Sequence, residues 1–332
     1  GWRSYQPWLG RWLNPDPAGT VDGLNLYRMV RNNPITRLDQ RGLYGESLDR
    51  LLGVDDISNS KRKLGLEAID RQQLILDASG LTIDKRMSTH LEMYTYDSNP
   101  FVNDYLRHGV VKTYRKGFFP SEGDVAETSP DRVATLIDIV DSLPSTGNIS
   151  LYRGGAGDRG TSGEVFRMGF IRRGDILMNT DFTSFTESAY IAREFASTKN
   201  PNDSSSNFDR TSVIFEIKNH SNIKAIAPYS MRSRDPYYEA ESLARPGLAF
   251  VIKNIEERCT AFGGHTQAYM YVMLDEIARN ELPKLTVQKG VLGSAIFFDQ
   301  HVHDMRTGDP IDVEYFTNRL GIKSDPILRN YH

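Results

Sequence analysis

Two glutamates stand one residue apart in the second half of the chain, within Tyr237-Tyr238-Glu239-Ala240-Glu241-Ser242. In an extended strand, Glu239 and Glu241 project to the same side and Ala240 projects to the other. Two neighbouring carboxylates repel each other, which raises the pKa of one and lets the pair divide the roles of charge stabiliser and proton acceptor. A solvated acidic strand face is the ordinary alternative for a Glu-x-Glu pair taken alone.

A strand that ends in an arginine precedes this pair. Leu151-Tyr152-Arg153-Gly154-Gly155 combines apolar residues with an arginine and two glycines. The planar guanidinium of Arg153 can bind a phosphate, and the glycines let the backbone approach a ligand closely. A surface arginine beside a turn is the alternative for this pattern.

A hydroxyl-rich segment, Asp181 to Ser188, leads into a helix that carries Phe195. If the segment is extended, Ser184 and Thr186 share one face, where their hydroxyls can orient a carboxylate. The alternative is that Thr186 or Ser188 caps the helix that follows.

The arginine, the hydroxyl segment and the glutamate pair follow one another in an informative order. In that order they resemble the Arg-Ser-Glu class of mono-ADP-ribosyltransferases, which are toxin-like enzymes that use NAD. The segments that carry the resemblance further are Asn99–Arg107 as an early helix, Ser150–Gly155 as the first core strand, Phe182–Phe195 as a strand and helix, Glu239–Leu243 as the catalytic strand and Arg245–Val251 as the next strand. Where the class usually has Ser-Thr-Ser, this chain has Ser184-Phe185-Thr186.

The resemblance implies a role for each catalytic residue. Arg153 would clamp an NAD phosphate, and Gly154 would offer backbone groups to the nicotinamide amide. Ser184 would hold Glu241, which would bind the nicotinamide-ribose 2′-hydroxyl and stabilise an oxocarbenium-like transition state. Glu239 would orient or deprotonate the acceptor nucleophile.

The remaining implied residues complete the NAD site and the surface for the target. Thr186 belongs to the NAD site, and Phe195 packs on the nicotinamide ring, with a core position as its alternative. The loop Pro228–Tyr238 sits where the class recognises its target, and Tyr237 and Tyr238 are its candidate contacts. NAD is the substrate in this reading, and no metal is needed.

An enzyme of this class transfers ADP-ribose from NAD to a target-cell protein and releases nicotinamide. Glu-x-Glu usually goes with an arginine acceptor, and analogy suggests actin or a small GTPase as the modified protein. One alternative is an NAD glycohydrolase toxin without a protein acceptor, and another is a catalytically inert or binding-only cargo. Glu239 and its aromatic loop favour a real acceptor. An inert cargo is disfavoured because all four candidate catalytic residues are intact, namely Arg153, Ser184, Glu239 and Glu241.

The elements that must position these residues fall into two stretches. Between residues 44 and 143, apolar residues at three-to-four spacing predict helices at Ser47–Leu52, Lys61–Ser79, Asn99–His108 and Ser129–Leu143. From residue 149 onward, the pattern predicts strands at Ile149–Arg153, Gly174–Asn179, Ser212–Ile217, Glu239–Ser242, Leu248–Ile252 and Tyr269–Leu274, with a helix at Ser188–Ser197 and a polar loop at Asn200–Asn207. The expected class is α+β, with a helical part over 44–148 and a β-rich catalytic part over 149–332. The sheet is expected to be antiparallel-rich, and the resemblance adds that it is split.

Composition limits the classes of function. The chain has 332 residues, with 40 Lys and Arg against 43 Asp and Glu and a net charge of −3. This balance removes the electrostatic case for a nucleic-acid coat or an anionic-membrane binder, and no apolar run approaches the ~20 residues that span a bilayer. The single cysteine, Cys259, cannot form an internal disulfide or a cysteine-based zinc site. The run His301-Val302-His303-Asp304 is expected to hold ordinary surface histidines, and no metal.

The first 43 residues differ from the rest of the chain. They contain all three tryptophans and carry six arginines against three aspartates. Short strand-like pieces alternate with turn signals such as Asn14-Pro15-Asp16-Pro17 and Asn32-Asn33-Pro34, which is typical of a β-hairpin strip that is not stable alone. We therefore expect two units, 1–43 and 44–332, with Gly1 as an internal cut from a longer polypeptide.

This strip resembles the end of the Rhs-repeat-associated core, a module that closes the hollow β-shell of Rhs toxins and of the C subunits of Tc toxins. The segments that carry the resemblance are Arg3–Trp12, Asn14–Gly19, Asp22–Pro34 and Asp39–Leu43. In the family this module is an aspartyl self-protease, which implies Arg3, Asp16 and Asp39 as essential residues and cleavage between Leu43 and Tyr44. Turn formation beside Pro and Gly is the alternative for both aspartates.

The same resemblance implies partners and a location. The partners would be the remainder of the Rhs shell, the Tc A and B components or a secretion-system spike, and an immunity protein if the target cell is bacterial. The released toxin would be a secreted virulence factor that reaches the cytosol of the target cell, without membrane insertion by this fragment.

Overall fold

The computed structural model describes residues 5–6, 11–12, 37–38, 46–54, 57–108, 130–157, 160–199, 206–277, 289–292, 295–298 and 302–311. The chain divides into two compact units, the first formed by 1–56 with 258–267 and the second by 57–257 with 268–332. The implied self-cleavage residues Arg3, Asp16, Asp39, Leu43 and Tyr44 all lie outside the described residues. The protease and the boundary at residue 43 therefore stay predictions.

The first unit shows short paired strands among its described residues. β1 (Tyr5–Gln6) pairs with β2 (Arg11–Trp12), and β3 (Arg37–Leu38) pairs with β4 (Glu46–Ser47), both antiparallel. The helix α1 (Leu48–Leu52) follows directly and buries Leu52 completely.

The helices of the second unit precede its sheet in the chain. They are α2 (Ser58–Ala78), α3 (Lys85–Met93), the π-helical turn η4 (Tyr94–Ser98), α4 (Asn99–His108) and α6 (Pro130–Ser142). Three of them lie within a few residues of predicted helices, whereas α3 and η4 were not predicted. In α3 only Leu91 is buried, so its apolar periodicity is too weak to reveal the helix. Its start signal is Asp84, whose side chain accepts a hydrogen bond from the Met87 amide at 2.8 Å.

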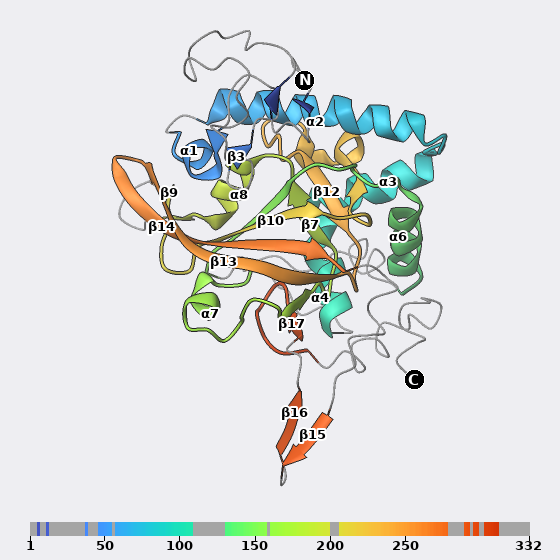
Figure 1. Ribbon diagram of the computed structural model, residues 1–332. Coiled ribbons are helices and arrows are strands. Elements are labelled where there is room, and N and C mark those ends of the chain that lie inside the picture. The colour runs from blue at the N-terminus through green and yellow to red at the C-terminus, as the bar shows by residue number, and fades with distance from the viewer. Residues whose placement is uncertain are drawn as a thin grey trace. The chain divides into compact units, whose positions relative to one another are not determined.

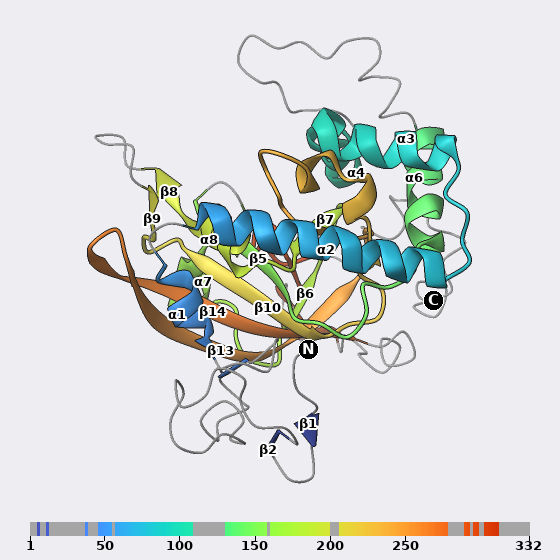
Figure 2. The same cartoon turned by 90° about the horizontal axis from the view of Figure 1, so that it is seen from above.

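The helices α3 and α6 pack beside each other at one end of α2 (Figures 1 and 2). An apolar cluster holds this part together, because Leu91 of α3, Val140 of α6 and Leu76 of α2 are all buried in it. Phe182 and Leu243 belong to the same cluster and come from the β-rich part. The helical layer is thereby fixed against the strands that carry the hydroxyl segment and Glu241.

The largest sheet among the described residues has nine strands, in the order β11-β12-β7-β5-β10-β14-β13-β6-β17. Its strands are β5 (Leu151–Gly155), β6 (Ile176–Met178), β7 (Thr183–Thr186), β10 (Val213–Asn219), β11 (Lys224–Ala225), β12 (Glu241–Ala244), β13 (Ala249–Phe262), β14 (His265–Glu276) and β17 (Val302–Asp304). Antiparallel pairs dominate, while β10 with β14 and β17 with β6 are parallel. The α+β class with an antiparallel-rich sheet is confirmed.

Smaller elements complete the second unit. They are α7 (Gly163–Arg167), α8 (Ala189–Ala196), the 3-10 turns η5 (Ala227–Tyr229) and η6 (Met231–Ser233), and the strand pairs β8 (Thr198–Lys199) with β9 (Ser206–Asn207) and β15 (Lys289–Leu292) with β16 (Ala295–Phe298). The predicted helix at Ser188–Ser197 is confirmed as α8. Within the described part of the chain, no helix is long and apolar enough to cross a membrane.

Candidate active site

A cavity opens where two neighbouring strands of the sheet part. The strand β5 pairs with β10 along its whole length, but with β7 only at Tyr152 opposite Thr186. Beyond Tyr152 the backbone of β5 leaves β7, and a cavity of about 430 Å³ lies there. It brings together the seven residues that the sequence assigned to catalysis and NAD binding, which are Arg153, Gly154, Ser184, Thr186, Phe195, Glu239 and Glu241.

Glu241 is the first residue of β12 and is buried in this cavity. The Ser184 hydroxyl donates to its Oε1 at 2.6 Å, and the Ser230 hydroxyl donates to its Oε2. Its backbone N–H donates to the Ser233 Oγ at 3.1 Å. Burial raises the pKa of this carboxyl, and the hydrogen bonds from the two hydroxyls oppose that rise. Both carboxylate oxygens are thus held by donors from different segments.

The glutamate pair does not have the geometry that the sequence predicts. The strand β12 begins only at Glu241, so Glu239 is not part of it. Tyr238 and Ala240 have φ angles of 50° and 48°, in the left-handed region that non-glycine residues seldom adopt. The expectation of one extended strand over 239–242 is therefore wrong, because the backbone turns at these two residues.

Backbone contacts fix Glu239 in its turn. Its N–H donates to the Arg232 carbonyl at 2.9 Å, and its own carbonyl accepts from the Thr186 hydroxyl at 2.7 Å. Burial, followed by the charge of Glu241, raises the pKa of Glu239 to about 8, while Arg232 and Lys61 oppose the rise. At neutral pH this carboxyl is largely protonated, in contrast to an ordinary glutamate.

Neither Thr186 nor Ser188 caps the first turn of α8 with its side chain, so the capping alternative is wrong. The Thr186 oxygen accepts from the Ser188 N–H at 3.0 Å while its proton goes to the Glu239 carbonyl. Ser188 stands at the N-cap of α8, but its side chain makes no capping hydrogen bond. Thr186 therefore joins β7 to the glutamate turn as well as to the entry of the helix.

Arg153 points its guanidinium to the same wall, where Nη1 donates to the Ser184 carbonyl at 2.8 Å. Burial lowers the pKa of Arg153, and the carboxylate of Asp181 opposes that shift. An arginine remains protonated at neutral pH despite such shifts. The cavity therefore has a cation that is fixed to the backbone of Ser184, the residue whose hydroxyl holds Glu241.

Gly154 has a steric reason to be glycine. A Cβ atom built on it would lie 1.9 Å from the Ala192 carbonyl oxygen of α8. Any side chain at this position would push α8 away from β5. Gly154 lines the cavity as expected. Its lack of a side chain is what allows α8 to approach β5 closely.

Three aromatic residues were assigned from the sequence. Phe195 lines the cavity with 41% of its surface exposed, so its alternative as a core residue is wrong. Tyr237 is 44% exposed, and the guanidinium of Arg232 lies 4.6 Å from its ring centre. Tyr238 is half-buried and packs on α2, where a Cβ atom on Gly65 would lie 2.7 Å from the Tyr238 Cβ. Tyr237 is the more accessible of the two tyrosines.

Several site residues were missed from the sequence. Gln72 of α2 is completely buried, and its Nε2 lies 2.7 Å from Glu187 Oε1, 3.1 Å from Ser242 Oγ and 3.2 Å from the Glu241 carbonyl. Its Oε1 accepts from the Ala227 N–H at 2.8 Å. A glutamine within a long amphipathic helix gives no local signal of this role, because its partners come from distant segments.

Ser230 was also missed as a partner of Glu241. It stands before η6, where its side chain accepts from the Arg232 N–H at 3.2 Å. This capping position is readable from the sequence, whereas its contact with Glu241 is not.

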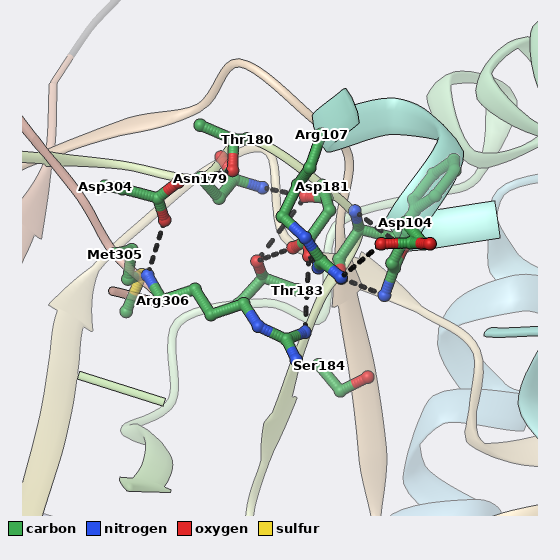
Figure 3. A network of polar contacts seen from close by, with 12 residues as sticks. Asp104, Arg107, Asn179, Thr180, Asp181, Thr183, Ser184, Asp304, Met305 and Arg306 are labelled. Carbon is green, nitrogen blue, oxygen red and sulfur yellow. Dashed lines mark hydrogen bonds and ion pairs between the residues drawn. The ribbon is translucent and has the colours of Figure 1, made fainter. Parts of the chain in front are cut away.

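A polar network surrounds Asp181, which lines the cavity as Arg153 does (Figure 3). The buried carboxylate pairs with Arg107 of α4 and, at 3.6 Å, with Arg306. Burial raises the pKa of Asp181, and Arg107 and Arg306 both oppose that rise. Arg107 also lies 3.9 Å from Asp104 within α4. The early helix is thereby tied to the strand that carries Ser184.

His303 differs from the expectation of surface histidines. It is only 4% exposed, and its Nδ1 lies 3.0 Å from the Gly308 carbonyl oxygen. Its Nε2 lies 3.7 Å from Asp175. The residue is a buried part of the β17 turn, because β17 packs against β6. His301 lies outside the described residues.

Comparison with known proteins gives a short match of high identity near the N-terminus. Toxin subunit YenC2 of Yersinia entomophaga is 72% identical over 43 residues, which are 13% of this chain and 4% of that protein. Toxin subunit YenC1 of the same organism is 63% identical over 51 residues, which are 15% of this chain and 5% of that protein. The chain thus matches about a twentieth of the length of these relatives. No protein-family model matches it.

Solved structures give a match over most of the chain. The ADP-ribosyltransferase Vis, in complex with an inhibitor, has a TM-score of 0.51 at 18% identity, covering 80% of this chain and 99% of that one. The Vis toxin from Vibrio splendidus has a TM-score of 0.50 at 18% identity, covering 80% and 100%. The chain therefore has the mixed α+β fold of the ADP-ribosyltransferase toxins.

Proposed function

We propose that the protein is a mono-ADP-ribosyltransferase toxin, which cleaves NAD and transfers ADP-ribose to a protein of the target cell. The observation that carries this proposal is the convergence of Arg153, Ser184 and Glu241 on one cavity, with the Ser184 hydroxyl 2.6 Å from Glu241. The shared fold supports it independently, because that likeness covers 80% of the chain.

In this proposal the bond between nicotinamide nitrogen and ribose C1′ breaks, and its electron pair leaves with nicotinamide. Glu241 accepts a hydrogen bond from the ribose 2′-hydroxyl and stabilises the positive charge that develops at C1′. The positive charge of the NAD ring favours the ionised carboxylate on binding, against the effect of burial. Ser184 and Ser230 keep both carboxylate oxygens in place. Preorganised donors of this kind cost no rearrangement during the reaction.

The cavity also fits two parts of NAD, its diphosphate and its nicotinamide. Arg153 offers a cation for the diphosphate, and the half-exposed ring of Phe195 offers an apolar surface for nicotinamide. Gly154 has no side chain, so β5 leaves room for the ligand between Arg153 and Phe195. Thr186 acts indirectly, because its hydroxyl donates to the Glu239 carbonyl and thereby positions Glu239.

The acceptor approaches from the side of Glu239 and the loop with Tyr237. Glu239 takes the proton of the attacking nucleophile, so the new bond to C1′ forms as that proton leaves. Arg232 packs on the exposed Tyr237 ring, and this pair forms the part of the loop that the target protein contacts. An arginine side chain of actin or of a small GTPase is the acceptor suggested by analogy.

NAD hydrolysis is a second activity that one observation favours. The pKa of Glu239 is raised to about 8, so near neutral pH most copies of the protein lack the ionised Glu239 carboxylate that would deprotonate a protein acceptor. Water needs no recognition loop and reaches the same C1′ centre. We therefore expect hydrolysis to accompany transfer, with its share larger at lower pH.

The N-terminal match to toxin subunits YenC2 and YenC1 supports a proposal for delivery. In this proposal residues 1–43 belong to an Rhs-type shell, and Arg3, Asp16 and Asp39 cut the chain between Leu43 and Tyr44. The released part is then secreted with the shell and its Tc or secretion-system partners and enters the cytosol of the target cell.

The test of the enzyme is labelled-NAD transfer in host and bacterial lysates, with nicotinamide release measured in parallel. Glu241→Gln keeps the size of the side chain but removes its charge, so both activities should fall by roughly three orders of magnitude or more. Glu257→Gln is the matched control, because Glu257 forms a surface ion pair with Arg167. A folded Glu241→Gln protein that transfers as fast as the Glu257→Gln protein would refute the proposal.

A further inference from the structure

Besides Arg153 and Arg232, a third arginine lines the cavity, and it comes from the last described segment of the chain. Arg306 follows β17 and lines the cavity together with Arg153 and Asp181. Figure 3 shows its side chain extended toward Asp181. None of the sequence patterns pointed to this residue, because residues 302–311 lie far along the chain from every other part of the site.

The backbone around Arg306 is fixed on several sides. The Met305 N–H donates to the Met178 carbonyl of β6 at 2.9 Å, and the Met305 side chain is only 2% exposed. The Arg306 N–H donates to Asp304 Oδ1 at 2.7 Å, and the Gly308 N–H donates to the Asp304 carbonyl at 2.8 Å. The Thr180 hydroxyl also donates to Asp304 Oδ2 at 2.7 Å. The turn is therefore anchored to the core and to a neighbouring loop, and it places the Arg306 side chain at the cavity.

The two arginines that share Asp181 are not equivalent. Arg107 makes the closer ion pair, its side chain is 11% exposed, and it does not belong to the cavity wall. Arg306 stays 3.6 Å from the carboxylate, its side chain is 42% exposed, and it does line the cavity. Arg107 thus neutralises Asp181 from outside the cavity wall. Arg306 lines the cavity and can donate N–H groups to a ligand there as well as to Asp181, since a guanidinium has five of them.

Arg306 also lies near Arg153. Burial is the main reason why the pKa of Arg153 is lowered, and the charge of Arg306 lowers it further. Two cations that repel each other across a cavity wall form a site for an anion with more than one charge, because the anion removes the repulsion. The diphosphate of NAD carries two negative charges.

We propose that Arg306 binds the diphosphate of NAD as a partner of Arg153, so that the segment 302–311 is part of the active site. This inference rests on the proposed function, since it assigns a residue to the substrate of that reaction. Arg153 holds the phosphate group nearer Ser184, whose carbonyl it contacts, and Arg306 holds the diphosphate from the Asp181 side.

The test uses the full chain and two probes, ADP-ribose and nicotinamide. Removing one charge-assisted contact in Arg306→Gln should weaken ADP-ribose binding roughly tenfold, measured by calorimetry, and raise the KM for NAD by a similar factor with kcat nearly unchanged. Inhibition by nicotinamide, which has no phosphate, should stay the same. Arg306→Lys should keep part of the affinity, since it keeps the charge but loses the planar fork.

The control is Arg173→Gln, which makes the same charge change at an exposed residue outside the cavity. A purely structural Arg306 would lower the melting temperature and weaken both probes alike in Arg306→Gln and Arg306→Lys, and that result would overturn the inference. If the unaltered chain binds neither ADP-ribose nor NAD, the proposed function itself fails. If it binds both, and Arg153→Gln weakens ADP-ribose while Arg306→Gln does not, only the role of Arg306 fails.

Discussion

Ser184 and Glu241 meet diagonally across two antiparallel strands, with the Ser184 hydroxyl 2.6 Å from Glu241 Oε1. In the register of β7 and β12, Ser184 stands opposite Leu243, and Glu241 stands opposite Thr186. Ser230 approaches the other carboxylate oxygen from the loop before β12. The site therefore holds its central carboxylate from a strand on one side and from a loop on the other.

Removing either hydroxyl should slow NAD cleavage. A hydrogen bond to a charged group is worth about 1.5–3 kcal/mol, so Ser184→Ala should lower kcat/KM for nicotinamide release by about 10- to 100-fold. Ser230→Ala should have an effect of similar size. The double variant should lose less than the product of the two, because both hydroxyls act on one carboxylate.

The matched control for these two variants is Ser88→Ala on the surface of α3, where the hydroxyl bonds the Lys85 carbonyl. If Ser230→Ala behaves like this control while Ser184→Ala is impaired, the loop hydroxyl has no part in catalysis.

Glu239 and Glu241 should be separable in their effects. Because Glu239 lies in the turn before β12 and next to the exposed loop, Glu239→Ala should abolish transfer to protein and leave measurable NAD hydrolysis. Glu241→Gln should remove both activities. The measurement is nicotinamide release beside label transfer for each folded variant. An equal fall of both activities in Glu239→Ala would place Glu239 in the NAD-cleaving apparatus instead.

Transfer should rise with pH while Glu239 ionises. Its pKa is raised to about 8, chiefly by burial and then by Glu241, so the carboxylate that accepts a proton becomes abundant only above that pH. Between pH 7 and 9 the ratio of transfer to hydrolysis should increase severalfold. In Glu239→Gln this ratio should be low and independent of pH, which separates Glu239 from titration of the acceptor.

The same raised pKa predicts a trend in stability. Between the ordinary pKa of 4.5 and about 8, the folded chain keeps a proton on Glu239 that the unfolded chain releases. The melting temperature should therefore fall as pH rises through this window, relative to that of Glu239→Gln. A constant difference between the two proteins from pH 5 to pH 8 would contradict the raised pKa.

Gly154→Ala should damage the packing of α8. The added Cβ would lie 1.9 Å from the Ala192 carbonyl, so helix and strand must separate, at a cost of about 1–3 kcal/mol. NAD binding should weaken as well, because α8 carries Phe195. Gly80→Ala is a useful contrast, since its Cβ would meet nothing within 4 Å and only the φ of +70° opposes it. Thermal unfolding should show a loss in both, but NAD binding should change only in Gly154→Ala.

Self-cleavage can be tested when the chain is expressed with its complete shell. We expect a free fragment that starts at Tyr44, identified by N-terminal sequencing. Asp16→Asn and Asp39→Asn should each leave the chain uncut, because one carboxylate cannot share a proton with an amide in the same way. Recovery of the Tyr44 fragment from Asp16→Asn would disprove the assignment of that residue.

The sequence by itself identified the candidate site residues and most of the elements. Arg153, Ser184 and Glu241 could be identified because each stands in a short pattern of apolar, hydroxyl and glycine residues, and these patterns come in a definite order. The helices α2, α4 and α8 follow from apolar spacing, which depends on residues only a few positions apart. Local information of this kind needs no knowledge of neighbouring strands.

Only the tertiary structure decided how these residues are held. Ser230 contacts Glu241 from the loop before β12, and Gln72 contacts it from α2. Arg306 reaches Asp181 because β17 pairs with β6. The positive φ angles at Tyr238 and Ala240, which move Glu239 out of the strand, have no signature in residue type because neither residue is a glycine. Sheet order and backbone strain are set by contacts between distant segments, and no local pattern records such contacts.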